Sequence, residues 1–134
     1  MSQPRITFII PCHNIEEDGY IIRCIESIRR TNPKADVIVV DSDSPNRSYI
    51  NKIDAEVLDI HNRNYAWGAY WQGYRHKRGS DLYVCIHDST VVNYEVKVEE
   101  WSEYLATPLS WFRENRNPTY EEIRLGCVNT QNVR

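Results

Sequence analysis

The chain has 134 residues, of which 41% are hydrophobic and 26% are charged, and its formal net charge is −3 at pH 7. This length predicts a single domain over residues 1–134 and excludes two domains with separate cores. The slight negative charge excludes a broad attraction to nucleic acid, and no apolar stretch reaches the about 20 residues that span a bilayer.

The four cysteines show no CxxC spacing of the kind that indicates a zinc site or a redox pair. They are Cys12, Cys24, Cys85 and Cys127. Most of them lie in apolar or strand-end contexts, so we expect reduced thiols that pack as small hydrophobes. The chain also begins without a signal-peptide pattern. Together these features predict a cytoplasmic protein.

Three short apolar runs each end abruptly in polar residues. Residues 6–10 lead into Pro11-Cys12-His13-Asn14, residues 37–40 into Asp41-Ser42-Asp43, and residues 82–86 into His87-Asp88-Ser89-Thr90. Continuous β-branched runs of this length are typical of strands buried on both faces, as in a parallel sheet covered by helices. A weaker run at residues 56–60 predicts another short strand.

The first helical pattern follows the first strand. Ile21, Ile25 and Ile28 recur at helical spacing, acidic residues precede them, and Asn32-Pro33 ends the pattern. After the second strand, the composition of residues 41–51 predicts a loop with one helical turn near Tyr49.

The second helical pattern covers residues 66–77. Its small residues Ala66, Ala69 and Gly73 share one face, which would let the helix lie close to a sheet or a ligand. The basic cluster at residues 75–78 is expected at the C-terminal end of this helix, where cations meet the helix dipole favourably.

The pattern changes beyond Thr90. Val91-Val92 predicts that the strand continues, and residues 93–134 form a short C-terminal part. This part contains an apolar cluster of Trp101, Leu105, Leu109, Trp111 and Phe112. An exposed aromatic cluster on a short chain makes a homodimer a reasonable expectation.

Polar side chains at the strand ends indicate a binding site. In open α/β sheets, ligands bind just beyond the carboxyl ends of the strands. If the three strands lie side by side, one edge of the sheet receives His13, Asn14, Asp41, Asp43 and Asp88. A carboxylate at the end of a buried strand is costly unless it is paired or coordinates a cation. Neither a GxGxxG nor a GxxxxGK[ST] motif is present, so a dinucleotide fingerprint and a P-loop are excluded.

Four segments in order resemble family 2 of the GT-A-type glycosyltransferases. Residues 6–14, ITFIIPCHN, resemble its opening strand, and residues 36–44, DVIVVDSDS, resemble its E-I-I-V-V-D-D-G-S strand. Residues 62–73 are similar to its N-x-G-x-x-x-A-x-N-x-G helix, and residues 86–90, IHDST, stand in the place of its D-x-D motif. The resemblance covers about residues 5–92.

The resemblance implies an α/β fold of the GT-A, Rossmann-like type, in which helices cover both faces of a mostly parallel twisted sheet. It also implies that residues 1–92 form the nucleotide-sugar-binding part. It implies transfer of a sugar from a UDP- or GDP-sugar to an acceptor hydroxyl on a glycan, lipid or protein, with Mn2+ or Mg2+ as cofactor. The implied nucleotide-sugar-binding residues are Pro11, His13, Asn14, Asp41, Asp43, Arg63 and Asp88, and the implied metal ligands are Asp88 and Thr90.

The chain departs from the family pattern in ways that keep other hypotheses open. One carboxylate of the metal motif is missing, and no aspartate follows Asp88 to act as general base. Only glutamates remain downstream, from Glu95 to Glu122, so the catalytic residue stays unassigned. The alternatives are a non-catalytic nucleotide-sugar-binding module and an interaction domain that uses the cluster at residues 101–112.

Several residues also carry simpler structural interpretations. Asp41 and Asp43 could form Asx turns in their loop, and the histidines at strand ends could bond to backbone groups. The aromatic side chains of residues 67–74 could stack on a sugar, but packing of a helix on a sheet explains most of them better.

Overall fold

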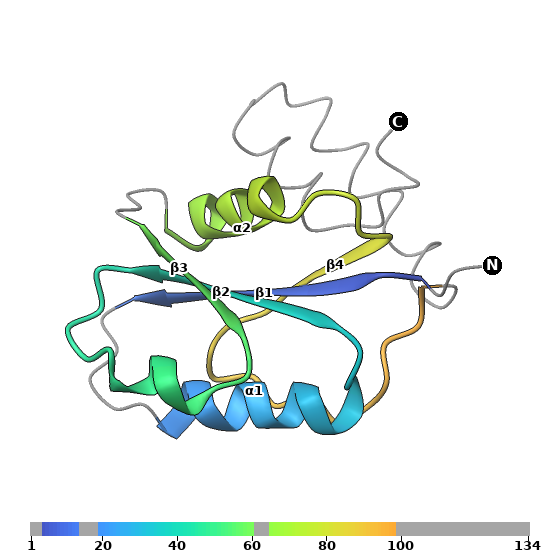
Figure 1. The fold of residues 1–134 in the computed structure, drawn as a ribbon, viewed down its shortest axis with the longest axis horizontal. Coiled ribbons are helices and arrows are strands. Elements are labelled where there is room, and N and C mark those ends of the chain that lie inside the picture. The colour runs from blue at the N-terminus through green and yellow to red at the C-terminus, as the bar shows by residue number, and fades with distance from the viewer. Residues whose placement is uncertain (1–3, 14–18, 61–64, 99–134) are drawn as a thin grey trace.

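The computed structural model describes residues 4–13, 19–60 and 65–98. Four strands in this part of the chain form one parallel sheet in the order β3-β2-β1-β4 (Figure 1). They are β1 (Ile6–His13), β2 (Asp36–Ser42), β3 (Glu56–Ile60) and β4 (Leu82–Cys85). The predicted parallel α/β sheet is confirmed, with all four expected strands.

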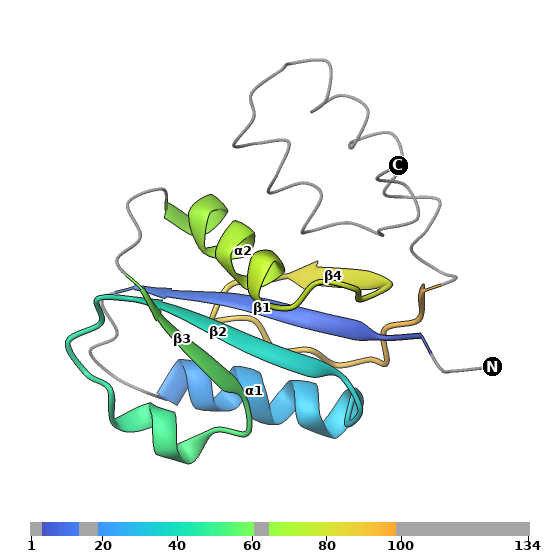
Figure 2. The ribbon, with the colours of Figure 1, turned by 45° about the horizontal axis from the view of Figure 1, so that its top comes forward.

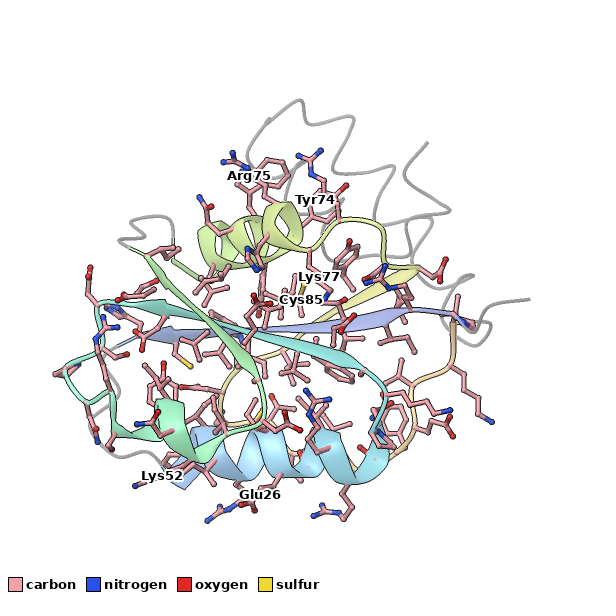
Figure 3. The ribbon with its side chains drawn as sticks, in the orientation of Figure 1. Glu26, Lys52, Tyr74, Arg75, Lys77 and Cys85 are labelled. Carbon is pink, nitrogen blue, oxygen red and sulfur yellow. The ribbon has the colours of Figure 1, made fainter. Side chains whose placement is uncertain are left out.

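Helices cover both faces of the sheet. Helix α1 (Gly19–Thr31) and the short 3-10 helix η1 (Ser48–Lys52) lie on one face, and helix α2 (Tyr65–His76) lies on the other (Figures 1 and 2). Both predicted helices and the predicted turn near Tyr49 are therefore confirmed. The exposed side chains of Glu26 and Lys52 project away from the sheet on one side and Arg75 on the other (Figure 3).

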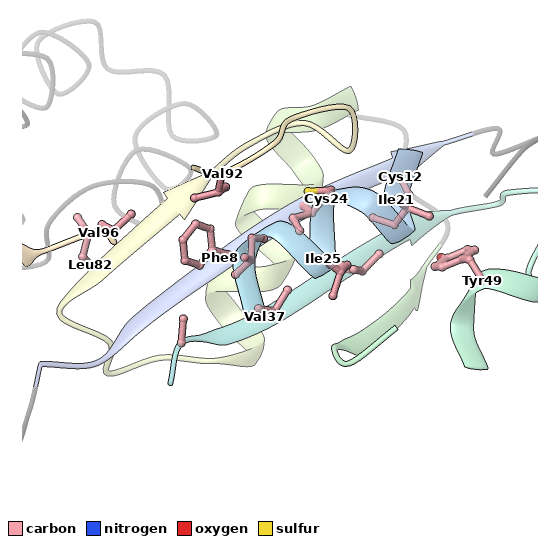
Figure 4. Close-up of a cluster of buried hydrophobic side chains, with 14 of the residues drawn as sticks. Phe8, Cys12, Ile21, Cys24, Ile25, Val37, Tyr49, Leu82, Val92 and Val96 are labelled. Atoms are coloured by element: carbon pink, nitrogen blue, oxygen red, sulfur yellow. The ribbon is translucent and has the colours of Figure 1, made fainter. Parts of the chain in front are cut away.

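Alternation along the strands creates two cores. Phe8, Ile10 and Cys12 of β1 face α1, and they pack with apolar side chains of that helix and with Tyr49 (Figure 4). Ile9 of the same strand faces α2 and packs on the opposite side. Tyr70 is buried in this second core, and Trp71 and Tyr74 pack against it. These three aromatic residues thus have the predicted packing role.

Gly73 brings α2 close to the centre of the sheet. A Cβ atom at this position would lie 2.6 Å from Cγ2 of Ile9, a fully buried β-branched residue of β1. Ala69, one turn earlier, is also buried. The predicted small-residue face is confirmed for these two positions, while the side chain of Ala66 lies outside the description.

Polar contacts tie the connections to the sheet. Arg29 of α1 donates from Nη1 to the Ala35 carbonyl at 2.6 Å and from Nε to the Asp54 carbonyl at 2.9 Å. On edge strand β3, Glu56 pairs with His76 and Asp59 pairs with Arg47, both at 2.8 Å. His76, the last residue of α2 and part of the predicted basic cluster, therefore makes a local contact with the sheet.

Three features differ from the sequence-based expectations. Strand β1 continues through Pro11 to His13, because its register with β2 runs on to Ser42. Val91 and Val92 do not continue a strand, because α1 side chains hold this segment. Cys12 and Cys24 are buried free thiols as predicted, but the prediction was wrong for Cys85, which is disulfide-bonded.

Residues beyond position 92 still belong to the packed unit. Val96 and Val98 lie in the core next to α1. The single domain over 1–134, with its division at residue 92, stays a prediction, and the apolar cluster at residues 101–112 lies outside the described part. No helix within the described ranges is long and apolar enough to cross a membrane.

We expect Gly73→Ala to destabilise the fold by about 1–3 kcal/mol, the usual cost of overpacking a core, partly offset by the better helix propensity of alanine. Gly19→Ala is the matched control, because nothing lies within 4 Å of a Cβ atom there. Chemical denaturation measures both variants, and equal stabilities would contradict the close contact between α2 and β1.

Candidate functional site

The carboxyl ends of the central strands bring two predicted site residues together. Asp41 of β2 is the register partner of Cys12 in β1, and Asp88 follows β4 on the other side of β1. Burial raises the pKa of the Cys12 thiol, and the negative charges of Asp88 and Asp41 raise it further. Both carboxylates therefore lie within electrostatic range of one buried sulfur atom, as the predicted convergence requires.

Asp41 has a fully buried side chain whose two oxygens bond within the protein. Oδ1 accepts a hydrogen bond from the Ser44 backbone N–H at 2.9 Å, and Oδ2 accepts one from the Tyr49 hydroxyl. Burial and this hydrogen bond raise the pKa of Tyr49 well above its usual value, so the hydroxyl stays protonated and donates. Asp41 thereby fixes the loop after β2 on η1.

Asp43 occupies an unusual backbone position in the same loop. Its φ angle is +57°, in the left-handed region, and its side chain is exposed. In the family pattern quoted above, glycine stands at this place of the D-D-G-S segment. Aspartate is one of the few other residues that tolerate this conformation. Asp43 thus places an exposed carboxylate at the sheet edge in a backbone conformation that glycine adopts most readily.

His13 and Pro11 lie within β1. The His13 ring is bonded through Nδ1 to the Ser42 carbonyl at 2.9 Å, so Nδ1 carries the proton. Pro11 is paired with Val40 in the register and is partly exposed. The predicted site residues Asn14 and Arg63 lie outside the described residues.

Asp88 stands in a turn directly after β4. The Ile86 N–H donates to the Ile9 carbonyl at 3.2 Å, and the Thr90 N–H donates to the His87 carbonyl at 3.1 Å. Asp88 is half-buried, and no lysine or arginine within the described ranges forms a salt bridge with it. Burial raises the pKa of its carboxyl, against the opposing effects of backbone N–H groups and of His87.

Asp88 is also close to both faces of the sheet. On the α1 side, burial raises the pKa of Cys24 to about 12, and the charge of Asp88 contributes to this increase. On the other side, burial raises the pKa of Tyr70 in α2 to about 12, and the charge of Asp88 again contributes. A half-buried carboxylate without a basic side chain bonded to it is the type of group that a cation or a ligand can neutralise.

A divalent cation would find few protein ligands at this edge. Within the described ranges, no group of three or more histidine, cysteine, aspartate or glutamate residues is placed to hold a metal ion. One carboxylate does fit Mg2+ or Mn2+ when the ion is shared with phosphate oxygens and water. Thr90, the second predicted ligand, lies two residues on at the end of the turn and is half-buried.

A pocket of about 500 Å3 lies at the opposite, amino edge of the sheet. Its walls include Ile6 at the start of β1, Asn32 and Lys34 after α1, and Glu95 and Lys97. Among the predicted nucleotide-sugar and metal residues that the structure describes, none lines this pocket. Glu95, one of the downstream glutamates considered as a general base, therefore lies away from Asp88.

The model of glycosyl transferase family 2 matches residues 7–108, which is most of the chain. The chain belongs to glycosyl transferase family 2. This match spans the strand ends that carry Asp41, Asp43 and Asp88. The roles of these residues in binding stay predictions.

Solved structures of S. aureus TarS share the fold. The structure of TarS residues 1–349 has a TM-score of 0.55 at 17% identity and covers 82% of this chain. A second structure, of TarS, gives 0.53 at 16% identity over 79%, and TarS 1–349 in complex with UDP gives 0.52 at 18% over 68%. These likenesses establish the GT-A, Rossmann-like architecture.

The present chain spans only 32%, 20% and 29% of the lengths of these three TarS chains, in the order given above. No curated protein matches the chain. Family membership and fold are therefore established, while the activity of the whole protein is a matter for proposal.

Sequence reasoning missed the partner of Asp41. Tyr49 was expected only as part of a helical turn, and its hydroxyl group carries the contact. A usable signal was present, because a tyrosine seven residues after a buried strand can reach back to the strand end when the intervening loop forms a turn. Ser27 and Asn32 hold the segment after Asp88. Their signal was weaker: Ser27 is a polar residue on an apolar helical face, and Asn32 directly follows the helix.

We expect Tyr49→Phe to destabilise the protein by about 1–3 kcal/mol, because a buried carboxylate oxygen loses its donor. Tyr20→Phe removes the same hydroxyl group from a side chain that is 59% exposed, and it should be nearly neutral. Denaturation of both variants tests the assignment, and a neutral Tyr49→Phe would show that Asp41 does not depend on this donor.

We expect Asp88→Asn to raise the melting temperature at pH 7 by about 1–2 °C in the absence of ligand. The raised pKa of Asp88 means that the folded state disfavours its charged form, so the carboxylate lowers stability at pH values above the usual aspartate range. The gain should vanish as the pH falls below that range, where the group is protonated in both states. Thermal melts of Asp88→Asn and the wild type from pH 3 to pH 8 measure this difference in melting temperature. A difference that persists at low pH would show that the charge of Asp88 is not its cause.

Proposed function

We propose that the described residues form the nucleotide-sugar-binding part of a glycosyltransferase that uses a UDP- or GDP-sugar and a divalent cation. The observation that carries the proposal is the half-buried Asp88, which lacks a salt bridge to lysine or arginine in the described part of the chain. The sequence resemblance supports it, since residues 86–90, IHDST, stand in the place of the D-x-D motif. Such a carboxylate costs stability without a ligand and is stabilised when a cation binds. The UDP complex of TarS supports a uridine nucleotide as the first candidate.

In this proposal Asp88 and Thr90 hold Mn2+ or Mg2+, which would stabilise the negative charge on the departing diphosphate as an acceptor hydroxyl attacks the sugar. Asp43 offers the exposed carboxylate at the end of β2 for a base N–H or a ribose hydroxyl, and buried Asp41 holds its loop in place.

Further donor contacts in the proposal come from Pro11, His13, Asn14 and Arg63. His13 lies next to the β2 end, so its ring could pack against the base. Arg63 is the proposed phosphate partner, because a guanidinium group binds phosphate oxygens in a bidentate manner.

A second candidate function is a nucleotide-sugar-binding module without transfer activity. A specific observation favours it: Asp88 is the only carboxylate at its turn, and Asp41 is occupied by internal hydrogen bonds. The acceptor, a homodimer and the cytoplasmic location also stay predictions.

The test is calorimetric titration of UDP and of GDP into the full chain, with and without Mn2+. We expect Mn2+ to strengthen binding of one nucleotide, and Asp88→Asn to weaken the Mn2+-dependent binding by about tenfold or more, which is about 1.4 kcal/mol. Asp54→Asn is the matched control, because it makes the same charge change on a side chain that is 85% exposed.

Equal affinity of the wild type and Asp88→Asn, with no effect of Mn2+, would remove the proposed metal role. Hydrolysis of a panel of nucleotide sugars then separates the two candidate functions, since only a transferase should release free sugar. A thermal shift also reports binding, because ligand at 100 times Kd adds roughly 2.7 kcal/mol of stability.

A further inference from the structure

Side chains of helix α1, and of Asn32 directly after it, hold the chain segment that follows Asp88. After β4 the chain crosses to the face of the sheet that α1 covers and runs alongside this helix (Figures 1 and 4). Ser27 Oγ accepts a hydrogen bond from the Val92 N–H at 2.9 Å. Asn32 Oδ1 accepts one from the Val96 N–H at 2.8 Å, and its Nδ2 donates to the Tyr94 carbonyl at 3.1 Å.

These polar side chains are buried inside an apolar core. Ser27 is 1% exposed and Asn32 is 5% exposed, and the neighbouring Val92 and Val96 are buried with them. Ser27 also donates to the Cys24 carbonyl at 2.7 Å, so its hydroxyl is used as donor and as acceptor. A buried hydroxyl is tolerated when it is bonded in this way, and a buried N–H left without an acceptor is costly.

The two ends of the Asp88 turn are therefore fixed by different elements. On its N-terminal side, Ile86 is bonded to Ile9 of β1, which continues the β1–β4 pairing by one residue. On its C-terminal side, Val92 is bonded to Ser27 of α1. Between these anchors, the Thr90 N–H closes the turn on the His87 carbonyl, and the Cys24 thiol lies 4.0 Å from the same carbonyl oxygen.

We propose that Ser27 is a positioning residue for Asp88, holding the turn from His87 to Thr90 in the geometry that receives a cation-bound nucleotide. This inference rests on the proposed function. Ser27 does not touch the ligand in this scheme. It acts through Val92, because loss of its acceptor oxygen frees the C-terminal anchor of the turn, and a looser turn must be ordered again when ligand binds.

The test compares Ser27→Ala with Ser80→Ala in the full chain. Both serines are 1% exposed, and the hydroxyl of Ser80 is bonded to Thr7 at the opposite edge of the sheet. The two variants should lose similar thermal stability. Only Ser27→Ala should speed amide hydrogen exchange at Thr90 and Val92, by about tenfold. Only this variant should also weaken UDP binding in the presence of Mn2+, by about three- to tenfold. UDP binding without Mn2+ should change little.

Equal exchange rates and equal Mn2+-dependent affinities in the two variants would overturn the proposal. Thr31→Val serves if Ser27→Ala does not fold, because the Thr31 hydroxyl donates to the Ser27 carbonyl at 2.7 Å, lies 3.5 Å from the Val92 carbonyl and accepts from Asn32 at 2.9 Å. Thr31→Val should speed amide exchange at Thr90 and Val92 and weaken Mn2+-dependent UDP binding, both by less than Ser27→Ala. If this variant matched the wild type in both exchange and affinity, the proposal would also be overturned. A wild type that binds neither UDP nor Mn2+ would overturn the proposed function, and the exchange rates would still decide whether Ser27 holds the turn.

Discussion

Strand β1 is paired in parallel with β2 on one side and with β4 on the other, and the site depends on this central position. Because all the strands run in the same direction, their polar ends meet at one edge. Asp41 lies in β2 and Asp88 follows β4. These strands are not neighbours, and β1 between them brings both carboxylates within range of Cys12. The close contact of Gly73 with Ile9 then seats α2 on the same strand.

The two carboxylates at this edge have different physical roles. Asp41 is buried with both oxygens bonded, so it contributes to the shape of the loop after β2. Asp88 is half-buried and forms no salt bridge with a lysine or arginine in the described part of the chain. Burial therefore leaves its charge poorly stabilised in the folded state. A half-buried carboxylate that costs stability in the folded state is typical of a binding site.

The strands and helices could be predicted because burial on both sheet faces leaves continuous apolar runs and because helix faces repeat regularly. The extension of β1 through Pro11 could not be predicted from the sequence, because it depends on the register with β2. Val91-Val92 is a β-branched pair that favours a strand locally, but the acceptor for the Val92 N–H is Ser27, far back in the sequence. The motif position of Asp88 was visible in the sequence, whereas the internal bonding of Asp41 required knowledge of where Tyr49 lies.

Edge strand β3 has a consequence for the behaviour of the protein in solution. It stands at one end of the strand order, and its residues are exposed or only partly buried. An unpaired strand edge can recruit another chain by adding a further strand. Glu56 and Asp59 place carboxylates along this edge, each paired with a side chain from outside the sheet. Charged side chains on an edge strand oppose the addition of a further strand, so we expect Glu56 and Asp59 to disfavour pairing of a second chain with β3.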